Sequence, residues 1–235
     1  MKKLVIFDLD GTLLNTIADL GNACNYALRK GGYAEHPLTA YNYMVGNGIR
    51  RLMERAAPDA SPETIELLLE DFRNYYDEHC TERTEAYPGM PELLETLTAK
   101  GIKVAVASNK YQAAVDRIIA HYFPQIKFSA IRGERPDCPR KPDPSVVFAL
   151  LNECPTPKAD ILMVGDSAVD METARRACIG SVGVTWGFRP VSELRGAYAD
   201  HIVSDPSEIL TLAGAEMGKG SETNAGAPAA HPLCY

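Results

Sequence analysis

Short, uninterrupted apolar runs separated by helical stretches constrain the fold of this chain most. Leu4 to Phe7 is the first such run, and it is followed by others at 104–107, 161–164 and 182–184, with weaker ones at 127–131 and 201–203. Runs of this kind are typical of strands buried on both faces of a parallel sheet. Helical patterns at 91–100, 111–122 and 144–152 lie between them. The alternation predicts an α/β fold with a doubly wound, Rossmann-like parallel sheet.

The segment 15–85 breaks this alternation. It contains three helical patterns, at 16–30, 49–56 and 61–80, and Ser61 with Pro62 suits the start of the third. We expect an inserted helical domain, called the cap below, between two pieces of the core domain at 1–14 and 86–213. Residues 214–235 are rich in Gly, Ala, Ser, Thr and Pro, which predicts a flexible C-terminal tail.

Bulk properties exclude several classes of protein. The net charge is -7 and no long basic run interrupts it, so nucleic acid and anionic membranes are disfavoured as partners. The apolar run after Met1 is too short for a secretory signal or a membrane span, and the six cysteines are scattered as in a protein with reduced thiols. We therefore expect a cytoplasmic protein, either a monomer or a homodimer.

Two aspartates, Asp8 and Asp10, directly follow the first predicted strand in the motif Asp8-Leu9-Asp10-Gly11-Thr12. The carboxyl ends of the strands form the ligand crevice of an open parallel sheet. Two carboxylates there can bind one divalent cation, or divide the roles of nucleophile and acid/base between them. Taken alone, the motif is explained equally well by an ordinary Asp-Gly turn.

Further polar groups lie near the ends of other predicted strands. Asp166 and Asp170 are four residues apart where the chain enters a helix, and helix capping explains one of them more easily than both. Ser108 ends a strand at a predicted helix N-terminus, where it serves either a phosphate or the helix cap. Lys141 is suited to holding a phosphate, although a single lysine is more often a solvated surface residue. The joint pattern favours a phosphate site.

These residues, in this order, resemble the motifs of the haloacid dehalogenase superfamily of phosphohydrolases. The likeness extends from Met1 to about Leu212 and includes a helical cap after the first motif. Within the superfamily the chain is most similar to phosphoglycolate phosphatases. That similarity rests on Val45-Gly46-Asn47-Gly48, Asn109-Lys110 and Gly180-Ser181-Val182-Gly183-Val184-Thr185. Ser108 stands where this subgroup usually has threonine, and Asn15 replaces an aspartate common at the cap hinge.

The resemblance implies a Mg²⁺-dependent phosphatase that hydrolyses a small phosphorylated metabolite, with 2-phosphoglycolate as the first candidate. Asp8 would be the nucleophile that becomes phosphorylated, and Asp10 the general acid and base. Asp8, Asp166 and the backbone carbonyl of Asp10 would hold the metal ion. Asp170 would support Lys141 or a metal-bound water.

The resemblance also implies a set of substrate contacts. Ser108, Asn109 and Lys141 would hold the phosphate, and Thr12 belongs to the same first motif. Substrate carboxylate contacts are expected from Asn47, Arg50, Arg51 and Lys110. Arg50 and Arg51 fit equally well as solvated charges on a helix.

Other activities stay open on the same residues. A β-phosphoglucomutase-like phosphotransferase shares the fold and the aspartyl-phosphate, and pyrophosphate is a further possible substrate. A signalling receiver domain is disfavoured by the helical insertion and by Asp10. A catalytically silent interaction protein is disfavoured because all four motifs are intact. Dehalogenase and phosphonatase relatives lack a carboxylate at the position of Asp10.

Overall fold

The computed structural model describes residues 1–215 and contains a six-stranded parallel sheet in the order β5-β4-β1-β6-β7-β8. Strand β1 lies in the middle of the order, between β4 and β6. The strands span Leu4–Phe7 (β1), Lys103–Tyr111 (β4), Ala130–Glu134 (β5), Ile161–Gly165 (β6), Gly180–Val184 (β7) and His201–Val203 (β8). The α/β fold class predicted from the sequence is therefore confirmed.

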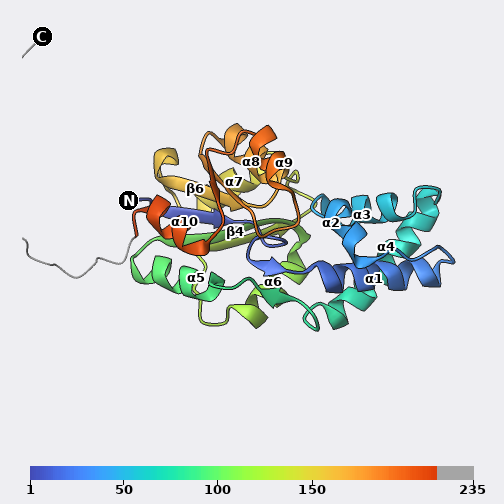
Figure 1. Ribbon diagram of the computed structural model, residues 1–235. Helices are drawn as coiled ribbons and strands as arrows, with labels where there is room; N and C mark the ends of the chain where they lie inside the picture. Colours follow the sequence, from blue (N-terminus) through green and yellow to red (C-terminus); the bar gives the residue numbers. More distant parts are fainter. Residues whose placement is uncertain (216–235) are drawn as a thin grey trace, which may run out of the picture.

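Helices cover both faces of the sheet (Figure 1). One face packs against α5 (Met90–Ala99), α6 (Gln112–Tyr122) and α10 (Pro206–Ala213), and the other against α7 (Ser145–Glu153), α8 (Ala168–Ala177) and α9 (Val191–Gly196). Successive side chains of β1 point to opposite faces, so Val5 and Phe7 join one buried cluster while Leu4 and Ile6 join the other. Burial on both faces explains the continuous apolar runs of the sequence.

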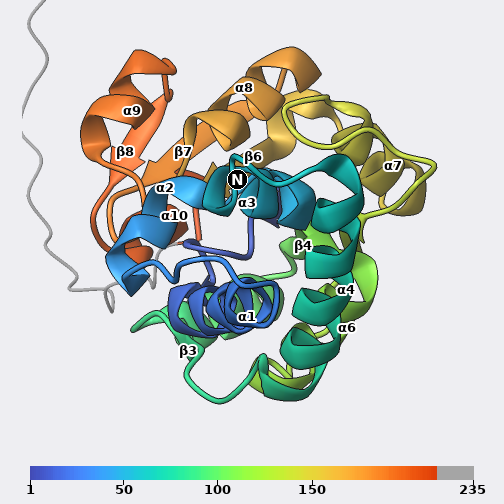
Figure 2. The ribbon, with the colours of Figure 1, turned by 90° about the vertical axis from the view of Figure 1, so that its right-hand side faces the viewer.

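The helices of the segment 15–85 lie together beside one end of the sheet (Figure 1, Figure 2). Among them α1 packs against α4, and the Ser61 hydroxyl caps α4 by accepting a hydrogen bond from the Thr64 amide. A two-stranded antiparallel ribbon of β2 and β3 lies where the chain leaves and re-enters the core. The elements are β2 (Leu14–Asn15), α1 (Ile17–Lys30), α2 (Tyr41–Met44), α3 (Gly48–Ala56), α4 (Pro62–His79) and β3 (Glu85–Ala86), with 3₁₀ turns at Leu38–Ala40 and, in the core, Lys158–Asp160.

Two boundaries differ from the sequence-based expectation. Strand β5 spans Ala130–Glu134 and not 127–131, because its pairing with β4 begins at Ala130, opposite Ala105. Strand β4 continues to Tyr111 and α6 begins only at Gln112, so Ser108 does not cap that helix. A phosphate cradle made by Ser108 at the N-terminus of α6 is therefore excluded.

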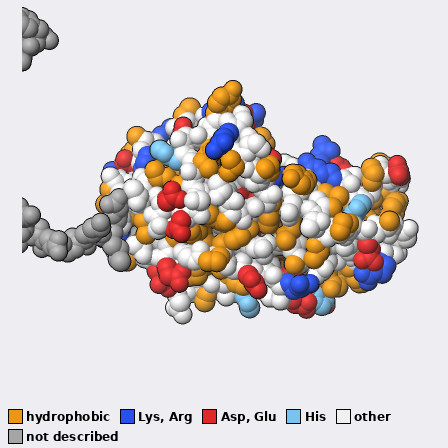
Figure 3. All heavy atoms as spheres, viewed as in Figure 1, with side chains coloured by type: hydrophobic (Ala, Val, Ile, Leu, Met, Phe, Trp, Pro, Cys, Tyr) orange, Lys and Arg blue, Asp and Glu red, His pale blue; other side chains and the backbone are white. Residues whose placement is uncertain are grey.

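The division into core, cap and tail stays a prediction, and the tail from residue 216 onward lies outside the described residues. Within residues 1–215, none of the helices has both the length and the apolar character needed to cross a membrane. On the face drawn in Figure 3, basic side chains are interspersed with acidic and apolar ones.

Candidate active site

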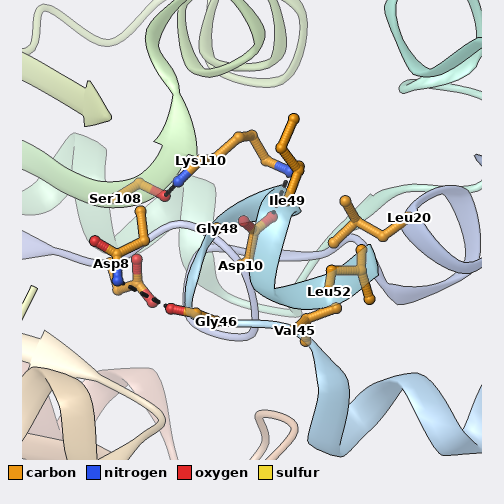
Figure 4. Close-up of a pocket in the computed structure, with 11 residues that line it drawn as sticks. Asp8, Asp10, Leu20, Val45, Gly46, Gly48, Ile49, Leu52, Ser108 and Lys110 are labelled. Carbon is orange, nitrogen blue, oxygen red and sulfur yellow. Dashed lines mark hydrogen bonds and ion pairs between the residues drawn. The ribbon is translucent and has the colours of Figure 1, made fainter. Parts of the chain in front are cut away.

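The predicted motif residues converge at the carboxyl ends of the central strands. Asp8 follows β1 and lines one pocket together with Ser108 and Lys110 from the end of β4 (Figure 4). Asp166 follows β6, and Lys141 comes from the loop after β5. These positions lie far apart in the chain, and the parallel sheet brings them together because all its strands end at this edge.

Lys141 connects two of the carboxylates. Its Nζ lies 2.8 Å from Asp8 Oδ1 and 2.7 Å from Asp170 Oδ1, with only 2% of its side chain exposed. Burial alone would lower the pKa of Lys141, but the charges of Asp170 and Asp8 outweigh it and raise the pKa above its ordinary value. Lys141 is therefore a fixed positive charge beside Asp8.

Three buried carboxylates form a cluster at this edge. Asp8, Asp166 and Asp170 each offer an oxygen within 4.8 Å of the others. Burial, followed by the charge of Asp170, raises the pKa of Asp8 from 3.8 to about 7, although Lys141 opposes the shift. Burial and the charges of Asp170 and Asp8 raise the pKa of Asp166 well above its usual range. This excess of buried negative charge fits a divalent cation held by oxygen ligands.

Both carboxylate oxygens of Asp170 are bonded to neighbouring side chains, which distinguishes Asp170 from Asp8 and Asp166. Its Oδ2 accepts a 2.7 Å hydrogen bond from the Ser167 hydroxyl, in a capping box at the start of α8, and its Oδ1 contacts Lys141. The supporting role of Asp170 toward Lys141 stays a prediction, which rests on this 2.7 Å contact between the two groups.

Two glycines leave room for Asp166. A Cβ added to Gly11, where φ is +86°, would lie 2.3 Å from Asp166 Oδ2, and one added to Gly187 would lie 2.2 Å from Asp166 Cβ. The Phe188 amide donates a 2.7 Å hydrogen bond to Asp166 Oδ2. The carboxylate is thus held between backbone segments that tolerate no side chain.

Asp10 faces the cap and not the carboxylate cluster. Its Oδ1 accepts a 2.6 Å hydrogen bond from the Thr16 hydroxyl and lies 3.1 Å from Lys110 Nζ. Lys110 is 2% exposed at its side chain and also donates a 2.9 Å hydrogen bond to the Tyr76 hydroxyl of α4. Asp10 and Asp8 line the same pocket, an arrangement that their predicted roles of acid/base and nucleophile require (Figure 4).

The cap side of this pocket is apolar. Its free space is about 30 Å³, and the cap contributes Leu20, Val45, Gly46, Gly48, Ile49 and Leu52 (Figure 4). Ser108 lines the core side, and its hydroxyl accepts a hydrogen bond from the Lys110 amide at 3.2 Å. A leaving group here would meet one buried ammonium, that of Lys110, opposite an aliphatic wall.

Several predicted contacts lie elsewhere. Arg50 forms an ion pair with Glu66, and Arg51 forms one with Glu54, both at the protein surface. Asn47 Oδ1 accepts a hydrogen bond from Arg55. None of these predicted cap residues is among the residues that line the pocket, so their role toward a substrate stays a prediction.

Thr12 is fully buried within the first motif. Its carbonyl accepts a hydrogen bond from Trp186 Nε1, and within residues 1–215 its hydroxyl has no hydrogen-bond partner. A contact between Thr12 and a substrate stays a prediction.

Three residues that contact the site belong to none of the motifs found in the sequence. Thr16 binds Asp10, Tyr76 binds Lys110, and Arg189 donates to backbone carbonyls of the cap. Thr16 is the first residue of the helix predicted at 16–30 and precedes α1 in the structure, yet its hydroxyl makes no capping bond to α1. Tyr76 occurs at an apolar position of its helix, where the pattern predicts only core packing.

Comparison with known proteins gives one consistent result. Residues 5–184 match the model of the family described as haloacid dehalogenase-like hydrolase. A phosphoglycolate phosphatase of Aquifex aeolicus is 31% identical over 215 residues, covering 89% of this chain and 96% of the relative. A crystal structure from Lactobacillus delbrueckii subsp. bulgaricus superposes with a TM-score of 0.85 at 31% identity, covering 91% of this chain and 99% of the other.

A crystal structure of a predicted phosphoglycolate phosphatase from Haemophilus somnus has a TM-score of 0.83 at 29% identity, and covers 90% of this chain and 97% of the other. The family match spans both motif-bearing parts of the core and the helices between them. The chain belongs to the haloacid dehalogenase-like hydrolase family.

Proposed function

We propose that this chain is a Mg²⁺-dependent phosphatase that hydrolyses a small phosphomonoester, with 2-phosphoglycolate as the first candidate. The observation that carries the proposal is the arrangement of Asp8, which has Lys141 on one side and the pocket with Asp10 on the other. The similarity to phosphoglycolate phosphatases over most of the chain supports the same substrate. The proposal also places the protein in the cytoplasm, as its scattered cysteines predict.

The first step transfers the phosphoryl group to the protein. Asp8 attacks phosphorus in line, a new bond forms between its carboxylate oxygen and phosphorus, and the bond from phosphorus to the leaving oxygen breaks. Asp10 gives its proton to that oxygen, so the alcohol departs neutral. Lys141 and Ser108 hold the phosphate oxygens and stabilise their charge in the transition state.

The second step releases phosphate. Asp10, now a carboxylate, takes a proton from water as that water attacks the phosphoaspartate, and the bond between phosphorus and the Asp8 oxygen breaks. Asp8, Asp166 and the backbone carbonyl of Asp10 would hold Mg²⁺. A bound Mg²⁺ neutralises the repulsion between a carboxylate nucleophile and a phosphate dianion.

The pocket favours a small leaving group with an anionic end. Lys110 offers one buried ammonium, and Val45, Ile49 and Leu52 offer no hydrogen bonds to the hydroxyls of a sugar. A two-carbon carboxylate such as glycolate matches one cation and an apolar wall. A sugar phosphate would leave several hydroxyls facing aliphatic groups.

The test is phosphate release from 2-phosphoglycolate, glucose phosphates, nucleotides and pyrophosphate, each with Mg²⁺ and with chelator, on the wild type and on Asp8→Asn. The proposal expects Mg²⁺-dependent turnover that is fastest with 2-phosphoglycolate and lost in Asp8→Asn. Equal turnover of many monoesters would remove the substrate assignment but keep the mechanism. Transfer of phosphate between sugar positions without release would indicate a mutase.

A further inference from the structure

A short segment of the cap, residues 43–47 from the end of α2 to the start of α3, is held by side chains of the core. Arg189 Nη2 donates a 3.0 Å hydrogen bond to the carbonyl of Val45, and Asn109 Nδ2 donates one of 3.0 Å to that of Gly46. Arg140 Nη1 lies 3.4 Å from the carbonyl of Asn47. The hydrogen bonds from the core to this segment thus go to three successive backbone carbonyls.

The side chain of Asn109 contacts the catalytic loop as well as the cap. Its Oδ1 accepts a 2.9 Å hydrogen bond from the Lys141 amide, and its Nδ2 donates 3.0 Å to the Lys141 carbonyl. Asn109 is buried. Its side-chain amide bonds both the backbone N–H and the backbone carbonyl of Lys141, and it also bonds the carbonyl of Gly46 in the cap. Displacement of Gly46 removes one of the three bonds that fix this amide.

Arg189 links the same cap segment to Asp166 less directly, through its neighbour in the chain. It directly follows Phe188, whose amide binds Asp166 Oδ2. Its guanidinium also lies 5.6 Å from the centre of the Tyr43 ring, a cation–π contact with the same cap segment. Segment 43–47 therefore contacts the backbone of Lys141 through Asn109. Through Arg189 it contacts the segment after β7, in which the Phe188 amide binds Asp166.

The free space of the pocket explains why this contact matters. With Val45, Ile49 and Leu52 in place the pocket offers about 30 Å³, too little for a phosphomonoester, so the cap and the core must separate for substrate to enter. Separation of the whole cap would carry segment 43–47 with it and break the bonds that Asn109 and Arg189 make to it.

We propose that Asn109 and Arg189 are positioning residues that couple docking of segment 43–47 to the placement of Lys141 and Asp166. The active site is complete only when the cap segment is docked. The expected kinetic effects rest on the proposed phosphatase function, whereas the structural coupling does not.

The structural test uses ¹⁵N–¹H spectra of the full chain with Mg²⁺. Arg189→Ala touches neither Asn109 nor Lys141, yet we expect it to shift or broaden the amide resonance of Lys141. Asn109→Ala should reciprocally move the amide resonance of Val45. Amides of α4 should stay unchanged in both variants, which excludes unfolding of the cap. A Lys141 resonance that is unmoved by Arg189→Ala would overturn the coupling.

The kinetic test uses the fastest substrate of the panel. Asn109→Ala and Arg189→Ala should each lower kcat about 10- to 100-fold. The fold-loss of kcat in the double variant should be at least about fivefold smaller than the product of the two single fold-losses. The reason is that either single substitution already disrupts the shared docking step. Asn152→Ala, an exposed asparagine of α7, is the matched control that keeps wild-type kcat. Losses that multiply fully would contradict a shared docking step. If the wild type turns over nothing, the proposed function fails and the spectra still decide the coupling.

Discussion

The Thr16 hydroxyl donates a 2.6 Å hydrogen bond to Asp10 Oδ1, which joins the residue before the first cap helix to the proposed acid/base group. This bond and the ammonium of Lys110 fix the carboxylate on the pocket side. Position is as important as chemistry for a group that must reach the leaving oxygen.

Thr16→Val removes this bond and keeps the shape of the side chain. We expect kcat to fall about 5- to 20-fold with KM little changed, because general acid–base catalysis depends on the placement of Asp10. Steady-state kinetics on the best substrate measures it. Thr211→Val, at an exposed position of α10, should leave kcat as in the wild type. An unchanged kcat in Thr16→Val would remove any positioning role for the bond.

The buried carboxylates predict how the metal-free protein responds to pH. Folding raises the pKa of Asp8 from 3.8 to about 7, so the folded state binds more protons than the unfolded state between these values. The stability contributed by protonated Asp8 is present below about pH 4 and is lost as the pH rises through 7. Raised pKa at Asp166 acts in the same direction.

Asp8→Asn isolates this effect in melting curves taken with chelator. We expect the variant to melt about 5 °C or more above the wild type at pH 8, and close to it at pH 4.5. Mg²⁺ should stabilise the wild type more at pH 8 than at pH 5, because it binds the ionised carboxylates. A difference between the two proteins that does not grow with pH would contradict this account of Asp8.

Lys110→Met should change the preference between substrates. Loss of its contact with Asp10 affects every substrate, but loss of the ammonium should affect most those substrates whose leaving group carries a carboxylate. We expect kcat/KM for 2-phosphoglycolate, relative to p-nitrophenyl phosphate, to fall about 10- to 100-fold. Lys103→Met, an exposed lysine at the start of β4, is the control. An unchanged ratio would mean that Lys110 serves Asp10 alone.

Gly11→Ala and Gly101→Ala make a matched pair. Both glycines have positive φ, +86° and +76°, but a Cβ at Gly11 meets Asp166 while one at Gly101 meets nothing within 4 Å. Both variants should lose about 1 kcal/mol of stability from backbone strain. Only Gly11→Ala should also lose about 10- to 100-fold in apparent Mg²⁺ affinity, because Asp166 is displaced. Equal Mg²⁺ affinities, from activity against metal concentration, would exclude that displacement.

The sequence predicted the sheet and the convergence of the motifs because both depend on local patterns. Val104–Ala107 and Ile161–Val164 are continuous apolar runs, and each lies within a strand of the structure. β5 was placed three residues early, since its half-exposed residues carry a weak pattern and pairing with β4 sets its start. The helices α2, α9 and α10 are short and were not predicted.

The contacts between cap and core were not predictable from the sequence for a different reason. Asn109 and Arg189 bind carbonyl oxygens of the cap, and every residue has a carbonyl, so the sequence of the accepting segment carries no signal. Arg50 was expected near a substrate because of its charge, but its pairing with Glu66 depends on how α3 packs against α4. Such contacts follow from tertiary structure alone.

The central position of β1 has a consequence for the order in which the sheet can form during synthesis. Leu4 pairs with Lys103 on one side and with Ile161 on the other. During synthesis, β1, which directly precedes Asp8, therefore cannot pair on both sides before residue 161 has been made. Pairings between residues so far apart in the sequence make folding slow. The residue proposed to do the chemistry is synthesised before both strands that flank β1, and the later of them, β6, ends only at Gly165.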